Sequence, residues 1–229
     1  MFQQVMNWMR DNKILPQISD TERQALEAGD VWIDGQFFGG KVDFEKILAE
    51  NYDQLPAHEQ AFLDGPVEKL CAMLDDWKIT HEQYDLPDKV WKFIRENGFF
   101  GLVIPKEDGG LGFSNTAHSE IVMKISTRSV SAAVTVMVPN SLGPGELLMH
   151  YGTDEQKQRL LPSLASGQRL SAFALTEPGA GSDLTALKTT ATLDGDHYVV
   201  NGEKLFITNA VPGRTIGLVC RIDDRPAVL

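Results

Sequence analysis

The chain has 229 residues, 42% of them hydrophobic and 8% aromatic, as is usual for a globular protein that buries a sizeable core. Its 21 basic and 32 acidic side chains give a formal net charge of -11, which disfavours nucleic acid and anionic membrane surfaces as partners. Cys71 and Cys220 fit neither a metal motif nor a disulfide framework, no stretch is apolar enough to span a bilayer, and the first residues lack a signal-peptide pattern. We therefore expect a cytoplasmic protein with no transmembrane segment.

Residues 1–55 are expected to form an N-terminal appendage, in which no motif indicates a chemical function. Apolar residues at positions 5–9 and 14–15 give its start an amphipathic character. This pattern favours packing against protein, and peripheral contact with the inner membrane is the alternative.

Residues 56–168 are predicted to form an all-α domain. Pro87 and Gly98 supply start and stop signals for one helix, and Ser114 is a suitable N-cap for the next. Before them, a long helix is predicted from apolar residues at three-to-four-residue spacing: Phe62, Val67, Leu70, Leu74 and Trp77.

The end of this domain carries two further helix predictions. The apolar stretch 130–138 has a β-branched composition, but its helical neighbours favour a buried helix. Thr153 and Gln156 have capping-box spacing, so we predict a helix that starts there and stops near Gly167.

After Gly167 the hydrophobic period becomes strand-like, and residues 169–229 are predicted to form an incomplete antiparallel β domain. The fold class is therefore α+β. The pairs Asp194-Gly195 and Asn201-Gly202 are expected to form tight hairpin turns. The predicted strands cover residues 170–176, 189–193, 197–200, 204–208 and 216–220, with the entry to another at 226–229.

The most informative stretch begins at Ala174, where a short strand runs directly into a Pro-Gly turn. Gly179 and Gly181 can adopt a positive φ and allow a ligand close to the backbone. Consecutive amides in such a turn suit an anion such as pyrophosphate, and Ser182 adds a hydroxyl. An ordinary loop is the alternative on composition alone.

Several motifs, in order along the chain, resemble those of the acyl-CoA dehydrogenase family. The resemblance implies an N-terminal helical domain, a middle β domain and a C-terminal four-helix domain, of which this sequence contains only the first two. Narrower features resemble the large bacterial dehydrogenases of fatty-acid β-oxidation. The family motifs lie at 86–112, 151–157, 174–186 and 201–209, and the narrower features at 64–68, 79–82 and 139–148.

The resemblance also implies a site for FAD. Ser182 would contact the FAD phosphates and lie beside the pantetheine of the acyl-CoA substrate, and Gly181 would let the cofactor approach. The family often has Tyr at the position of Phe173 and commonly Trp at that of Phe206, so this chain keeps the rings but loses their polar groups. The flavin ring would be lined by Phe173, Leu175 and Thr176 on one side and by Phe206, Ile207 and Thr208 on another.

The implied reaction is α,β-dehydrogenation of an acyl-CoA, with electrons passed to an electron-transfer flavoprotein. The catalytic base is expected beyond Leu229, in the four-helix domain, so none is assigned here, and Glu177 matches a non-catalytic glutamate of the family. The full-length protein is expected to be a homo-oligomer, and the five histidines have no metal-ligand spacing. The alternatives are an acyl-CoA oxidase or flavin monooxygenase of the same fold, or a flavin-binding interaction module.

Overall fold

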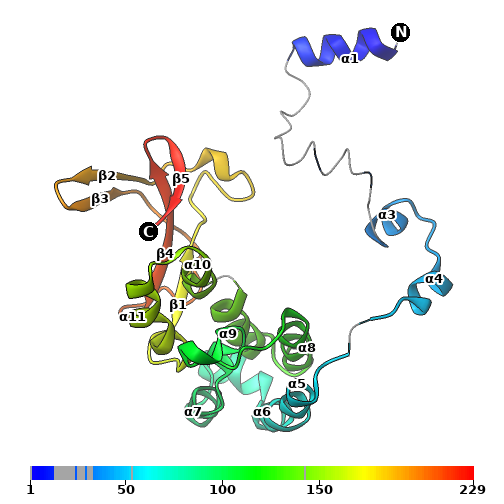
Figure 1. Cartoon of the computed structure of the whole chain (residues 1–229), viewed down its shortest axis with the longest axis vertical. Coiled ribbons are helices and arrows are strands. Elements are labelled where there is room, and N and C mark those ends of the chain that lie inside the picture. Colours follow the sequence, from blue (N-terminus) through cyan, green and yellow to red (C-terminus); the bar gives the residue numbers. More distant parts are fainter. Residues whose placement is uncertain (1, 13–23, 25–28, 30–32, 53, 142) are drawn as a thin grey trace. The chain divides into compact units, whose positions relative to one another are not determined.

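The computed structural model describes residues 2–12, 24, 29, 33–52, 54–141 and 143–229 (Figure 1). It divides into two units, Met1–Asp53 and Gln54–Leu229. The second unit contains both the helical part and the sheet.

The first unit contains the short helices α1 (Phe2–Asp11), α3 (Ile33–Phe38) and α4 (Phe44–Ala49). The Asp43 carboxylate caps α4 by accepting a hydrogen bond from the Lys46 amide at 3.0 Å. Residues 14 and 15 of the predicted amphipathic start lie outside the described residues. Among the residues described, no helix is long and apolar enough to cross a membrane.

The helical part of the second unit consists of helices and short helical turns that follow one another closely. In chain order they are α5 (Ala57–Phe62), η1 (Leu63–Val67), α6 (Glu68–Met73), η2 (Lys78–Gln83), α7 (Asp88–Glu96), η3 (Phe99–Gly101), η4 (Lys106–Asp108), α8 (Asn115–Ser126), α9 (Val130–Ser141), α10 (Pro144–Tyr151) and α11 (Asp154–Ala165).

The long helix predicted from residue 56 to Trp77 is interrupted. Pro66, which has no amide to donate, lies in the wide turn η1, and Leu74 is extended. The Asp75 carboxylate then accepts from the Lys78 amide and begins a new helical segment. Trp77 is 64% exposed and stacks on His81, so its predicted place on the buried face is wrong.

The other helix signals are confirmed. Helix α7 follows Pro87 and ends before Gly98, which has a φ of 74°. The Ser114 hydroxyl accepts from the Ala117 amide at 3.1 Å and caps α8. The stretch 130–138 is helical, and α9 continues through Pro139 as far as Ser141.

The predicted capping box at the start of α11 is present. The Thr153 hydroxyl accepts from the Gln156 amide at 3.2 Å, and the Gln156 side chain accepts from the Thr153 amide at 2.9 Å. We expect Thr153→Ala to lower the free energy of unfolding by about 1 kcal/mol. Urea denaturation measures this loss. Thr153→Ser, which keeps the hydroxyl, is the control, and an equal loss in both variants would contradict the capping role.

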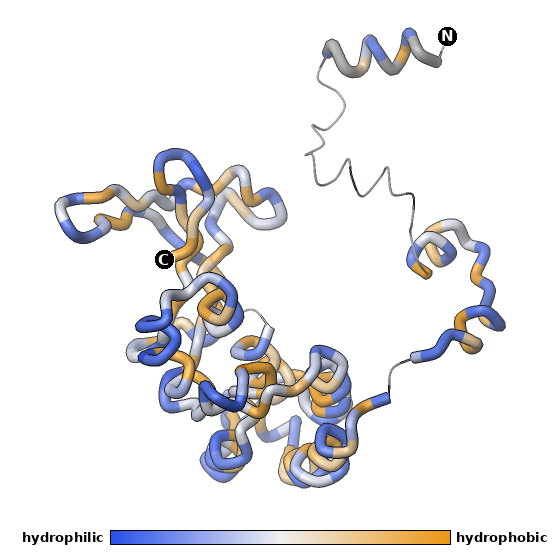
Figure 2. The backbone as a smooth tube through the Cα atoms, viewed as in Figure 1, coloured by the Kyte–Doolittle hydropathy of each residue, from blue (hydrophilic) through white to orange (hydrophobic). Residues whose placement is uncertain are grey.

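The main core lies among the helices. Helices α8 and α9 pack side by side, and Figure 2 shows hydrophobic residues gathered along them. Its largest side chains with under 2% exposure include Phe99, Phe100, Leu70, Ile94, Leu102, Ile121 and Ile125. This core supports the strand that leaves α11 toward the sheet.

The α+β class is confirmed, but the sheet is mixed where an antiparallel one was predicted. Its order is β1-β4-β2-β3, with β5 also paired to β4. Strands β1 and β4 pair in parallel, from Ser171 opposite Thr215 to Ala174 opposite Leu218. The intervening β2–β3 hairpin and loops return the chain to the same end, so β4 runs in the same direction as β1. The strands are β1 (Ser171–Ala174), β2 (Thr190–Asp194), β3 (His197–Asn201), β4 (Thr215–Ile222) and β5 (Arg225–Val228).

Two turn predictions have different outcomes. A tight turn joins β2 to β3 as predicted, but its two residues are Gly195 and Asp196, because Asp194 still pairs with His197. The prediction of a strand at 204–208 is wrong, and Asn201-Gly202 therefore forms no hairpin turn. Phe206 and Asn209 have φ values of 56° and 65°, which interrupt an extended chain.

The predicted entry to a strand at 226–229 is confirmed by β5. It is reached through a turn that the sequence analysis did not identify. Asp223 and Asp224 both have a positive φ, as in the turns that suit the twist of a two-stranded ribbon.

Candidate functional site

The two segments that the sequence analysis assigned to the flavin ring lie side by side. We call residues 173–182 the signature segment and residues 204–209 the Lys204 loop. The Leu205 amide donates to the Thr176 carbonyl at 2.9 Å, and the Lys204 ammonium donates to the Leu175 carbonyl at 2.9 Å. These hydrogen bonds join segments that are about 30 residues apart in the sequence.

Glu177 is buried at the centre of this junction. Its carboxylate accepts from the amides of Lys188 and Thr189 at 2.7 and 3.0 Å and from the Lys204 ammonium at 2.8 Å. The two side chains of the ion pair are only 10% (Lys204) and 4% (Glu177) exposed. Both carboxylate oxygens are therefore engaged in holding the fold.

The charge state of Glu177 follows from these contacts. Burial on its own would raise the pKa of the carboxyl, but the hydrogen bonds from Lys204, Lys188 and Thr189 outweigh it and lower the pKa from 4.5 to about 2. Such a carboxylate is a weak base. Its environment disfavours removal of an α-proton by Glu177.

This lowered pKa predicts a pH dependence of stability. Because the folded pKa lies below 4.5, the stabilisation from Glu177 is complete above pH 4.5 and is lost as the pH falls toward about 2. We expect the free energy of unfolding to fall more steeply across this window in the wild type than in Glu177→Gln. Urea titrations at several pH values measure it, and parallel pH curves for the two proteins would contradict it.

The Pro-Gly turn leaves donors uncommitted. Glu177 and Ala180 exchange backbone hydrogen bonds across it at 2.9 and 3.2 Å. Gly181 and Ser182 are exposed, and their amides and the Ser182 hydroxyl make no hydrogen bond to any residue that the structure describes. This arrangement suits the oxygens of a phosphate.

The glycines of this turn do not use the positive φ that they can adopt. Neither Gly179 nor Gly181 has a positive φ, because the exchange between Glu177 and Ala180 closes the turn without it. A Cβ added at either glycine would meet no atom of the protein within 4 Å. The protein's own packing therefore does not require glycine here, and close approach of a ligand would supply a reason for it.

The side chains of the predicted flavin residues do not all face one place. Phe173 and Leu175 pack against a small core of Ala180, Leu187 and Val219. Side chains alternate along a strand, so Ala174 points to the opposite face. There it lines an open pocket with Ile207, away from the Phe173 and Leu175 side chains.

The Lys204 loop presents its other predicted residues to solvent. Phe206 is 92% exposed, and Thr208 is also exposed. Thr176 is half-buried and contributes its carbonyl to the contact with Leu205. The structure thus brings Thr176 and the Lys204 loop together through the backbone and leaves the Phe206 ring without packing.

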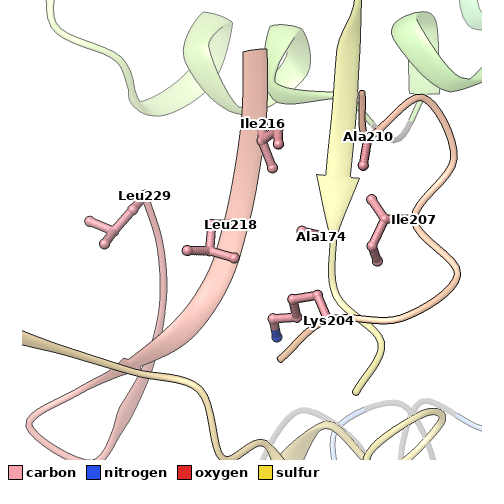
Figure 3. Close-up of a pocket in the computed structure, with 7 residues that line it drawn as sticks. All are labelled: Ala174, Lys204, Ile207, Ala210, Ile216, Leu218 and Leu229. Carbon is pink, nitrogen blue, oxygen red and sulfur yellow. The ribbon is translucent and has the colours of Figure 1, made fainter. Parts of the chain in front are cut away.

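The pocket on this face has a volume of about 640 Å³ and mainly apolar walls (Figure 3). A flat, largely apolar ring suits such walls. The free amides of Gly181 and Ser182 are not part of the pocket lining. Of the pocket's lining residues only Ile207 was predicted as a site residue. Alternation along β4 was the available signal for Ile216 and Leu218. The lining consists of Ala174, Lys204, Ile207, Ala210, Ile216, Leu218 and Leu229.

In the part of the chain that the structure describes, no group of three or more His, Cys, Asp or Glu side chains can hold a metal ion. His118 is part-buried, and burial lowers its pKa although Glu146 opposes the shift.

Near the signature segment, the structure offers amide donors, a hydroxyl and apolar walls for a ligand.

The chain is similar to known proteins over both its helical part and its sheet. Residues 57–168 match the family model for the acyl-CoA dehydrogenase N-terminal domain, and residues 172–228 match the model for the middle domain. Over 164 residues the chain is 47% identical to a 3-(aryl)acrylate reductase of Clostridium sporogenes, a match that covers 72% of this chain and 42% of the reductase.

Two solved structures are also similar. One is described as the electron transferring flavoprotein of Acidaminococcus fermentans, with 32% identity, a TM-score of 0.68 and coverage of 76% of this chain and 46% of that one. The other is an acyl-CoA dehydrogenase from Bacillus anthracis complexed with FAD, with 31% identity, a TM-score of 0.56 and coverage of 75% and 29%. The chain thus spans less than half the length of each of these proteins.

Proposed function

Because this chain belongs to the acyl-CoA dehydrogenase family, whose members are FAD-dependent oxidoreductases acting on CH–CH groups, we propose that it holds FAD for α,β-dehydrogenation of an acyl-CoA thioester. The observation that carries the proposal is the junction of the signature segment with the Lys204 loop: both segments line an apolar pocket, and the signature segment also carries the free amides of Gly181 and Ser182. We further propose fatty-acid β-oxidation as the setting and domain boundaries at 56–168 and 169–229, with residues 1–55 as an appendage.

Each part of the site has its own task in this proposal. The amides of Gly181 and Ser182 and the Ser182 hydroxyl hold phosphate oxygens, and Ser182 also neighbours the pantetheine of the substrate. Ile207, Phe206 and the pocket walls cover the ring and exclude water. When bound, FAD supplies the redox chemistry by taking the β-hydride as a base removes the α-proton. We place that base outside residues 1–229.

The wider setting is also part of the proposal. The substrate is an acyl-CoA, the electron acceptor is an electron-transfer flavoprotein, and the full-length protein is a cytoplasmic homo-oligomer.

A second function has an observation in its favour. The 47% identity to a 3-(aryl)acrylate reductase supports the same chemistry in the opposite direction, with a hydride delivered to a C=C bond. Nothing in the two flavin segments distinguishes the two directions, since both need the same cofactor and apolar walls.

An anaerobic visible spectrum tests the proposal. With FAD and a long-chain acyl-CoA, residues 1–229 are expected to show no bleaching, whereas the same chain joined to the C-terminal helical domain of a family member should bleach. Bleaching by residues 1–229 alone would place the base within them. In the joined protein, reoxidation of reduced flavin by a 3-aryl acrylate without bleaching by any acyl-CoA would instead establish the reductase.

A further inference from the structure

The geometry points to Lys204 as a positioning residue: we propose that its ammonium locks the Lys204 loop against the signature segment and so sets how both meet FAD. The positioning role rests on the proposed function, because that function supplies the ligand, FAD. The lock itself is a property of the protein alone and can be tested separately.

The Lys204 loop has few other attachments. Within residues 54–141 and 143–229, the hydrogen bonds that join it to the signature segment or to β1 come from Lys204, Leu205 and Asn209. The Asn209 bond, to the Ser171 carbonyl, is long at 3.4 Å. Two of the remaining three come from the Lys204 ammonium, so this group holds most of the junction.

The rest of the loop offers little packing to replace these bonds. Its residues belong to no strand, and Phe206 and Asn209 have a positive φ. Phe206, at the middle of the loop, is 92% exposed. Loss of the ammonium would therefore free the loop while the helical core remains intact.

Both ends of the ion pair are fixed, which makes the lock rigid. Glu177 is held by the Lys188 and Thr189 amides, and these tie it to the start of β2. The Lys204 ammonium is divided between the carboxylate and the Leu175 carbonyl. Removing the ammonium would leave a buried carboxylate without its cation and a carbonyl without its donor, and both are costly.

The helical part contains a control with the same kinds of bonds in a more exposed pair, whose side chains are 27% (Lys124) and 59% (Glu68) exposed. The Lys124 ammonium also pairs with a carboxylate, Glu68 at 2.6 Å, and donates to a backbone carbonyl, Leu63 at 3.4 Å. It contacts neither flavin segment. Lys124→Met therefore removes the same kinds of bonds away from the proposed site.

Two measurements on the chain of 229 residues test the proposal. Hydrogen exchange at the Leu205 amide reports the lock without any ligand, and titration with FAD reports its consequence. Lys204→Met should speed exchange at Leu205 and weaken FAD binding, each by roughly tenfold or more, while Lys124→Met leaves both near the wild-type values. Lys204→Arg should recover part of both, because it restores a cation in a different geometry. The visible circular dichroism of bound FAD should change in Lys204→Met alone.

The outcomes separate the lock from the cofactor. Unchanged exchange at Leu205 in Lys204→Met, or equal effects of the two methionine variants, would overturn the lock. Faster exchange with unchanged FAD affinity and circular dichroism would overturn the positioning role. If the wild type binds no FAD, the proposed function fails. Hydrogen exchange at the Leu205 amide then still tests whether Lys204 holds the loop. Should Lys204→Met not fold, Glu177→Gln, which keeps an oxygen for the amides, must show the same changes in weaker form.

Discussion

Replacing Phe99 with alanine is expected to lower the free energy of unfolding by about 3–5 kcal/mol. The side chain is fully buried in the helical core. Its ring lies 5.0 Å from that of Phe62 and 6.2 Å from that of Phe93, centroid to centroid. The Phe99 carbonyl accepts from the Asn140 side chain at 2.7 Å, and this bond limits how far the backbone can move to fill the space.

Phe206→Ala is the matched control, since it deletes the same ring from a side chain that is 92% exposed. Urea denaturation of both variants should show a large loss for Phe99 and almost none for Phe206. FAD affinity should show the opposite pattern, because Phe206→Ala should weaken FAD binding and leave the free energy of unfolding almost unchanged. Equal destabilisation by the two variants would contradict the assigned core.

Placing leucine at Gly181 is expected to weaken FAD binding by at least about tenfold, roughly 1.4 kcal/mol, with little loss of stability. A Cβ at this position meets no protein atom within 4 Å, and Gly181 has no positive φ. The protein therefore accommodates the side chain. The leucine side chain would, however, exclude a phosphate from the amides of Gly181 and Ser182, because it would lie where the ligand approaches.

Gly65→Leu provides the comparison, because Gly65 also has open space around an added Cβ and no positive φ, but lies in the helical part. Fluorescence titration with FAD and thermal unfolding of both variants separate ligand effects from folding effects. Unchanged FAD affinity in Gly181→Leu would remove this turn from the site.

Much of the helical part could be predicted from the sequence because its signals are local. Ser114 and Thr153 cap helices through contacts within three residues, and Gly98 ends one with its own backbone. The interrupted first helix shows the limit of this reasoning. The periodicity holds as far as Leu74 and fails at Trp77, because the side chain of Asp75 competes for a backbone amide and starts a new segment.

The β part was harder because its pairing is long-range. Apolar residues at 204–208 resemble a strand, yet this segment is held by the lone Leu205–Thr176 backbone bond and by Lys204. The parallel pairing of β1 with β4 depends on the path of the intervening chain, which the strand pattern does not specify.

The candidate site was predicted mainly through the resemblance. Physical reasoning identified the free amides at the Pro-Gly turn, although its glycines do not use the positive φ that they can adopt. Lys204 was quoted within a family motif, and neither its partner nor its burial could be read from spacing, because Glu177 lies 27 residues away in the sequence.

We propose above all that the signature segment and the Lys204 loop form a site for FAD. Its most direct test is an equilibrium titration of the chain with FAD, followed by flavin fluorescence and accompanied by far-ultraviolet circular dichroism to verify folding. We expect saturable binding that Gly181→Leu weakens and Gly65→Leu does not. A folded chain that leaves flavin fluorescence unchanged at all concentrations would contradict it.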